Sequence, residues 1–228
     1  MGSLDELEAR VSALEKKHYK VPANVEEIDE QVRRARAAVQ EKARLYSSVW
    51  KWVPTDYYQR SLAERAKCLG ASSVDFLCKS LLLENKKMAG GNNDVVVSSP
   101  KNPRFVLVIL QYAATLDVKK LTSVIRRLLP VSERLDESMY DFRIAAPEDN
   151  DRITGYANNA VTPFGLQEPV PIILTENVVK LRFFWMGGGH IHLKLGVATS
   201  EFCEALNPII GDISNPRTGE VDAGDMED

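Results

Sequence analysis

The chain has 228 residues, of which 44% are hydrophobic and 27% charged, and its formal net charge is −3. This length suits one ordinary domain with an extension, and the apolar fraction is high enough for a buried core. The near balance of charge argues against the long phosphate footprint of a DNA-binding protein, and no apolar run is long enough to predict a membrane span.

Most of the excess negative charge lies near the C-terminus. Residues 212–228 contain six acids and one base, which leaves 28 basic and 26 acidic residues in the rest of the chain. Such a nearly neutral body permits contact with one end of an RNA. Residues 209–228 hold few large apolar side chains, so we expect an acidic, disordered tail.

The cysteines and the N-terminus indicate the compartment. Cys68, Cys78 and Cys203 form an odd and widely spaced set, which argues against a disulfide framework and favours a reducing cytosol. The chain begins with charged residues and not with the apolar core of a signal peptide. We therefore expect a cytoplasmic protein.

Residues 1–45 are predicted to form two amphipathic helices separated by Val21-Pro22-Ala23-Asn24. Asn24 with Glu27 predicts a capping box at the start of the second helix. Two interpretations stay open: a helical hairpin that packs on its own body, or a coiled-coil module for a homodimer or a synthetase complex. The two seams are Leu4, Leu7, Val11, Leu14, His18 and Val25, Ile28, Val32, Ala35, Val39.

Residues 46–60 are rich in aromatic side chains and are predicted to form a linker. The rings could stack on nucleic-acid bases, or they could pin the linker onto the body. Ser61 and Glu64 then form a second predicted capping box, and Gly70 is expected to end the helix that Ser61 opens. The aromatic residues are Tyr46, Trp50, Trp52, Tyr57 and Tyr58.

From residue 74 the pattern changes to short strands, with two helices expected over 117–129 and 200–206 and a loop over 86–103. This alternation predicts an α+β domain over 61–208 with a mixed, largely antiparallel and barrel-like sheet flanked by helices. The predicted strands cover 76–84, 104–113, 141–146, 170–175, 181–186 and 190–197.

Two features suggest a site for an anionic ligand. Lys79 lies on the apolar face of its predicted strand, so its ammonium needs an ion-pair partner such as Glu84 or Glu148, a route to water, or a bound phosphate. Gly187-Gly188-Gly189 is expected to join two strands, either as a plain hairpin turn or as a backbone nest for an anion.

Other chemistries find little support in the sequence. His190 and His192 share a strand face with Lys194, which would repel a metal cation, and no third ligand lies nearby. No G-x-S-x-G motif predicts a nucleophilic serine. Cys78 is next to Lys79, but strand neighbours point to opposite faces. We therefore predict no metal and no cofactor.

Four segments in this order resemble the YbaK/ProX family of aminoacyl-tRNA deacylases, which are related to the editing domain of prolyl-tRNA synthetase. The resemblance is greatest to the free-standing eukaryotic branch and covers about residues 56–206. The segments are Leu62-Ala63-Glu64-Arg65-Ala66 with Leu69-Gly70, Leu77-Cys78-Lys79-Ser80, Thr154-Gly155-Tyr156 with Asn159-Ala160-Val161-Thr162-Pro163-Phe164-Gly165, and Gly187-Gly188-Gly189 with Leu193-Lys194-Leu195.

The resemblance implies roles for individual residues. Lys79 would hold the phosphate at the tRNA 3′ end, and the backbone around Val161, Thr162 and Pro163 would face the ester. The family motif begins with Gly where this chain has Asn159. The implied catalytic set is Lys79, Val161, Thr162 and Pro163, and the implied substrate-binding set is Lys79, Asn159, Ala160, Phe164, Gly165, Gly187, Gly188, Gly189 and His190.

The resemblance also implies the reaction. Such deacylases hydrolyse mischarged tRNA without a metal or a covalent nucleophile, with a ribose hydroxyl of the substrate assisting. A small amino acid such as Ala, Ser or Cys, on tRNA-Pro, is the expected substrate. The alternative is a non-catalytic scaffold subunit that binds tRNA or a synthetase through its N-terminal helices, with Asn159 marking a lost pocket.

Overall fold

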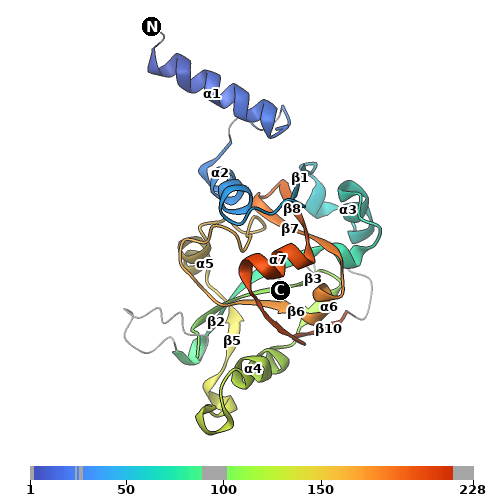
Figure 1. Cartoon of the computed structure of the whole chain (residues 1–228). Helices are drawn as coiled ribbons and strands as arrows, with labels where there is room; N and C mark the ends of the chain where they lie inside the picture. The colour runs from blue at the N-terminus through green and yellow to red at the C-terminus, as the bar shows by residue number, and fades with distance from the viewer. Residues whose placement is uncertain (1–2, 24, 26–27, 89–101, 218–228) are drawn as a thin grey trace.

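The computed structural model describes residues 3–23, 25, 28–88 and 102–217. The chain forms an α+β domain of two sheets with helices around them, and helix α1 stands apart from this body (Figure 1). In the described part of the chain, every helix is too short or too polar to cross a membrane. The α-helices are α1 Leu4–His18, α2 Glu30–Arg36, α3 Leu62–Leu69, α4 Val118–Arg127, α5 Pro147–Thr154, α6 Glu176–Val179 and α7 Thr199–Leu206.

The larger sheet has the order β5-β2-β3-β6-β9, with β2 antiparallel to β3 and β5, and β3 parallel to β6. The smaller sheet has the order β1-β8-β7 and is antiparallel, and β10 pairs with β4. The strands are β1 Val49–Trp52, β2 Cys78–Asn85, β3 Phe105–Gln111, β4 Ala114–Leu116, β5 Phe142–Ile144, β6 Ile172–Thr175, β7 Phe183–His190, β8 Leu193–Ala198, β9 Ile209–Gly211 and β10 Ser214–Pro216.

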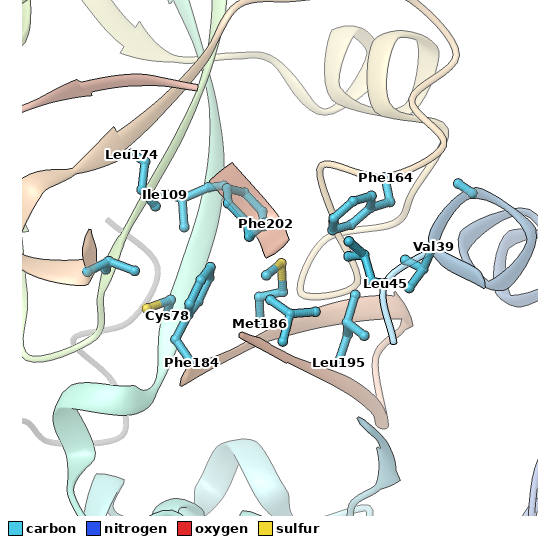
Figure 2. Packing of buried hydrophobic residues seen from close by; sticks show 13 residues of the cluster. Val39, Leu45, Cys78, Ile109, Phe164, Leu174, Phe184, Met186, Leu195 and Phe202 are labelled. Atoms are coloured by element: carbon cyan, nitrogen blue, oxygen red, sulfur yellow. The ribbon is translucent and has the colours of Figure 1, made fainter. Parts of the chain in front are cut away.

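Among the described residues, an isolated bridge between Leu77, just before β2, and Trp185 of β7 links the larger sheet to the β1-β8-β7 sheet. The main core fills the space between these sheets, where Ile109 and Leu174 face Phe184, Met186 and other apolar side chains (Figure 2). Burying such side chains stabilises the fold by about 1.5–3 kcal/mol each. The fold is therefore barrel-like without being a closed barrel, as predicted.

The capping signals of α3 have their expected geometry. Ser61 accepts a hydrogen bond from the N–H of Glu64, and the Glu64 side chain accepts from the N–H of Ser61. Gly70 has a φ of 73° and ends the helix in the left-handed conformation that glycine adopts without a Cβ clash. Local residue chemistry thus determines both ends of this helix.

The N-terminal extension divides into two parts with different environments. Helix α1 buries no residue, whereas α2 buries Val32, Ala35 and Arg36 against the body. The predicted capping box of Asn24 and Glu27 lies outside the described residues. Helix α2 begins at Glu30, with Asp29 as its N-cap, and continues as a π-helical segment over Ala37–Lys42. The hairpin interpretation therefore fits α2 and fails for α1.

Several predicted boundaries are wrong. Residues 46–60 are not a linker, because β1 pairs with β8 and Tyr57 is buried in a core cluster. Residues 209–217 are not a disordered tail, since β9 adds to the larger sheet and β10 pairs with β4. These strands have three or four residues each, too few to show a periodic pattern. The remaining tail lies outside the described residues.

Candidate functional site

A cavity of about 320 Å³ lies among β2, β7, the start of α5 and the loop that follows α5. Its wall combines apolar side chains with two lysines, and residues far apart in the sequence meet there. The lining residues are Tyr57, Tyr58, Leu69, Leu77, Cys78, Lys79, Ser80, Leu81, Leu82, Tyr112, Ile144, Ala145, Pro147, Asn150, Asp151, Ala157, Asn158, Asn159, Val161, Trp185, Met186, Gly187 and Lys194.

Lys79 is one of the two lysines in this wall. It lies on β2 opposite Leu110 of β3, and it is only 8% exposed. Glu84, which the sequence offered as a partner, forms ion pairs with Lys86 and Arg104. An ammonium group in the wall of a largely apolar cavity attracts an anionic group of a ligand.

The loop after α5 is fixed from within. Gly155 ends α5 with a φ of 68°, and the next residue, Tyr156, is fully buried. The Tyr156 hydroxyl donates a hydrogen bond of 2.6 Å to the carbonyl of Phe164, and the Thr154 hydroxyl donates one of 2.8 Å to the carbonyl of Asn150. The loop over 155–165 is thus closed on a buried tyrosine.

Asn159 has a φ of 64°, in the left-handed region. Glycine adopts this conformation without strain, and asparagine is among the residues that tolerate it best. Its N–H donates to Asn158 Oδ1 at 2.9 Å, and its carbonyl accepts from the Tyr58 hydroxyl at 2.9 Å. Asn159 therefore keeps the backbone shape that glycine would give at the first position of the motif.

Helix α2 holds the same loop from the outside. The Arg34 guanidinium donates to the carbonyl of Gly165 at 2.9 Å and also to the carbonyl of Gly155. Gln31 accepts a hydrogen bond of 3.3 Å from the N–H of Ala157. A helix of the N-terminal extension thus contacts both ends of the loop that forms one cavity wall.

The prediction that the three consecutive glycines form a loop between strands is wrong. They are part of β7, and the turn consists of Ile191 and His192. A Cβ on Gly187 would lie 2.3 Å from the carbonyl oxygen of Val161. At Gly189, where φ is 90°, it would meet Ala35 at 2.9 Å. The glycines therefore let the loop and α2 approach the strand closely, and the Gly189 N–H donates to the carbonyl of Ala160.

Lys194 is a site residue that the sequence reasoning missed. Both faces of β8 are buried, so Lys194 is 4% exposed between Leu193 and Leu195. Its Nζ donates to the Tyr58 hydroxyl at 2.6 Å and to the carbonyl of Ile191 at 2.9 Å. The available signal was a lysine within an apolar run, the same signal that identified Lys79.

The cavity unites part of the predicted site. Lys79, Asn159, Val161 and Gly187 line it. Phe164 packs into the main core, where its ring contacts Phe202, and Thr162 is fully buried without a contact to the cavity. The cavity wall also omits Ala160, Pro163, Gly165, Gly188, Gly189 and His190.

Metal and thiol chemistry find no support in the geometry. The residues that the structure describes include no group of three or more His, Cys, Asp or Glu side chains that could hold a metal ion. The His190 ring lies against the Trp52 ring in a tilted arrangement, with 5.3 Å between their centres, and burial lowers the pKa of both His190 and His192. Burial raises the pKa of the Cys78 thiol, which disfavours a thiolate nucleophile.

Residues 60–204 match the family model described as "Aminoacyl-tRNA editing domain". This match covers more than half of the chain. The chain belongs to the aminoacyl-tRNA editing domain family. The family hydrolyses mischarged aminoacyl-tRNA, so this editing domain is, at that level, a hydrolase whose substrate is an aminoacyl-tRNA. No curated protein matches the chain.

Solved structures share the fold of this editing domain. One is a candidate trans-editing enzyme for prolyl-tRNA synthetase, with 22% identity and a TM-score of 0.61, covering 82% of this chain and 99% of its own. Another, from work on grafting epitope backbones onto scaffold proteins, has 19% identity and a TM-score of 0.61, covering 83% of this chain and 100% of its own. At these identities the likeness concerns the fold alone.

Proposed function

We propose that the protein is a trans-editing deacylase that hydrolyses the ester between a small amino acid, such as Ala, Ser or Cys, and tRNA-Pro. The observation that carries this proposal is the buried Lys79 in the wall of a cavity of about 320 Å³, which Asn159 and Val161 of the loop also line. A cavity of this size suits a terminal ribose that carries a small aminoacyl group better than one whose aminoacyl group has a long side chain.

The chemistry needs positioning more than a strong nucleophile, because an aminoacyl ester is already activated. Water attacks the carbonyl carbon, the bond between that carbon and the ribose oxygen breaks, and a proton from the water passes to the ribose oxygen. The products are the free amino acid and a tRNA with its terminal hydroxyl restored. A ribose hydroxyl of the substrate orients the water, so this reaction requires no metal.

Lys79 and the loop have separate roles in this proposal. The Lys79 ammonium pairs with the phosphate at the tRNA 3′ end and so fixes the ester in the cavity. Of the implied catalytic loop residues Val161, Thr162 and Pro163, Val161 lines the cavity, so its backbone stabilises the oxyanion that develops on the carbonyl oxygen. Fixed backbone dipoles suit this task because they need no reorganisation during the reaction.

The test is hydrolysis of tRNA-Pro charged separately with Ala, Ser, Cys and Pro by the purified full-length chain. We expect release of at least one of the small amino acids well above the uncatalysed rate and little release of Pro. Hydrolysis of none of the four would overturn the proposal. The size of the differences has a limit, because one methylene group contributes only about 1–3 kcal/mol to discrimination.

We also propose that α1 is a docking helix that brings the enzyme into a complex with a partner protein. Leu4, Leu7, Val11 and Leu14 are 51–70% exposed along one side of this helix. A seam of this kind fits either a second copy of the chain or a synthetase in the cytoplasm. Light scattering of the full-length chain distinguishes a dimer from a monomer, and Leu7→Glu should abolish any dimer formed through this seam.

A further inference from the structure

We propose that Lys194 is a positioning residue that, together with Tyr58, holds the cavity loop at Asn159 in the orientation that the ester requires. This inference rests on the proposed deacylase function. Tyr58 precedes the segment that matches the family, and Lys194 lies on β8 near the end of that segment. Both residues line the cavity.

Three oxygen atoms from separate segments surround the Lys194 ammonium. Its Nζ is 2.6 Å from the Tyr58 hydroxyl, 2.9 Å from the carbonyl of Ile191 and 3.5 Å from the carbonyl of Asn159. The Tyr58 hydroxyl in turn donates to the carbonyl of Asn159 at 2.9 Å. An ammonium group has three donors and no acceptor, so this arrangement matches its protonated form.

The charge of Lys194 is stabilised by dipoles and rings. Lys194 is absent from the ion pairs of the described residues, and its Nζ lies 4.5 Å from the centre of the Tyr58 ring. Burying an ammonium group without a carboxylate partner costs desolvation free energy, and this cost indicates a role for Lys194 beyond packing. A methionine of similar length would fill the same space without the cost.

The surroundings also make this contact sensitive to pH. Burial, and secondarily the charge of Arg65, lower the pKa of Lys194 to about 7. The other titratable groups near Lys194 include Tyr57 and Tyr58 before α3, Lys51 opposite it on β1, His190 and His192 at the turn, and Lys79 and Tyr112 in the same cavity wall. Above about pH 7 the amine has one donor fewer for the three oxygens, so its hold on the loop weakens.

The experiment compares Lys194→Met and Tyr58→Phe with Lys51→Met, which changes the lysine opposite Lys194 on β1. We expect the first two variants to lower kcat about 10–100-fold with little change in KM, because a small displacement of the loop affects the reacting geometry more than tRNA binding. The Lys51→Met variant should retain the wild-type kcat.

Two further measurements separate positioning from folding. The ratio of wild-type to Lys194→Met kcat should fall as pH rises through about 7, since the wild-type amine then loses its proton. Amide hydrogen exchange of the peptide covering 157–161 should be faster in Lys194→Met and in Tyr58→Phe than in wild type or Lys51→Met. The exchange measurement needs no substrate, so it tests the inference even if the deacylase proposal fails.

A wild-type kcat and unchanged loop exchange in Lys194→Met would overturn the inference while leaving the proposed function intact. A kcat ratio that stays constant from pH 6 to pH 9 would also contradict it, because the positioning depends on the protonated amine. Absence of hydrolysis by the wild type, with faster loop exchange in the variants, would instead refute the deacylase proposal and support the structural link.

Discussion

Helices α1 and α2 look alike in sequence but differ completely in their environment. The side chains of the α1 seam are exposed, with Leu4 70% and Leu14 67% exposed, whereas Val32 and Ala35 of α2 are fully buried. Helix α2 also holds the cavity loop through Arg34 and Gln31. From this difference we propose that docking and support of the cavity loop use separate parts of one extension, which lies before the family match at residue 60.

Truncation provides the strongest test of this division. Removal of residues 1–45 should lower deacylation at least about 100-fold, because the loop loses Arg34 and the body exposes the surface under α2. Removal of residues 1–15 should leave the rate within about twofold, since α1 buries no residue. Equal rates for the two truncated chains in one deacylation assay would refute a catalytic role for α2.

A pair of neighbouring arginines sharpens the same comparison at single-residue level. Arg34→Ala removes hydrogen bonds to two loop carbonyls and should lower the free energy of unfolding by about 1–3 kcal/mol and kcat about 10-fold or more. Arg33→Ala removes a partly exposed ion pair to Glu15 of α1 and should cost less than about 1 kcal/mol, with an unchanged kcat. Denaturant unfolding and deacylation of both variants are the measurements. Indistinguishable variants would show that α2 does not support the loop.

The smallest expected effect concerns the position where this chain departs from its family. Asn159→Gly should keep the activity and change stability by less than about 1 kcal/mol, because glycine also adopts the left-handed φ of 64°. Asn159→Val should cost about 1–2 kcal/mol, since a β-branched residue is strained there. Thermal unfolding and deacylation check both variants, and a large gain of activity in Asn159→Gly would mean that Asn159 impairs the pocket.

Local chemistry determined the parts of the fold that could be predicted. The capping box of Ser61 and Glu64, the helix end at Gly70 and the apolar strands of the larger sheet all depend on nearby residues. Helix α5 was missed because its sequence, Pro147–Thr154, is short and mostly polar, with few apolar residues to show a period. The edge strand β9 depends on pairing with β6 and has too few residues to be recognised alone.

Long-range contacts account for what could not be predicted in the site. Lys79, Asn159, Val161 and Gly187 were found because each carries its own signal: a lysine among apolar residues, or a motif in a known order. Tyr58 and Lys194 are 136 positions apart, and no local pattern relates them. The role of Gly187 also required the structure, because its missing Cβ accommodates the carbonyl of Val161.

The central claim is that hydrolysis takes place in the cavity beside Lys79. The most direct test measures the single-turnover deacylation rate of Ala-charged tRNA-Pro by the Lys79→Ala variant, with Lys51→Ala as the control. Lys51 is a half-buried strand lysine outside the cavity wall. We predict a loss of at least about 100-fold for Lys79→Ala, an unchanged rate for Lys51→Ala and similar thermal unfolding for both. A wild-type rate in a folded Lys79→Ala protein would contradict the account.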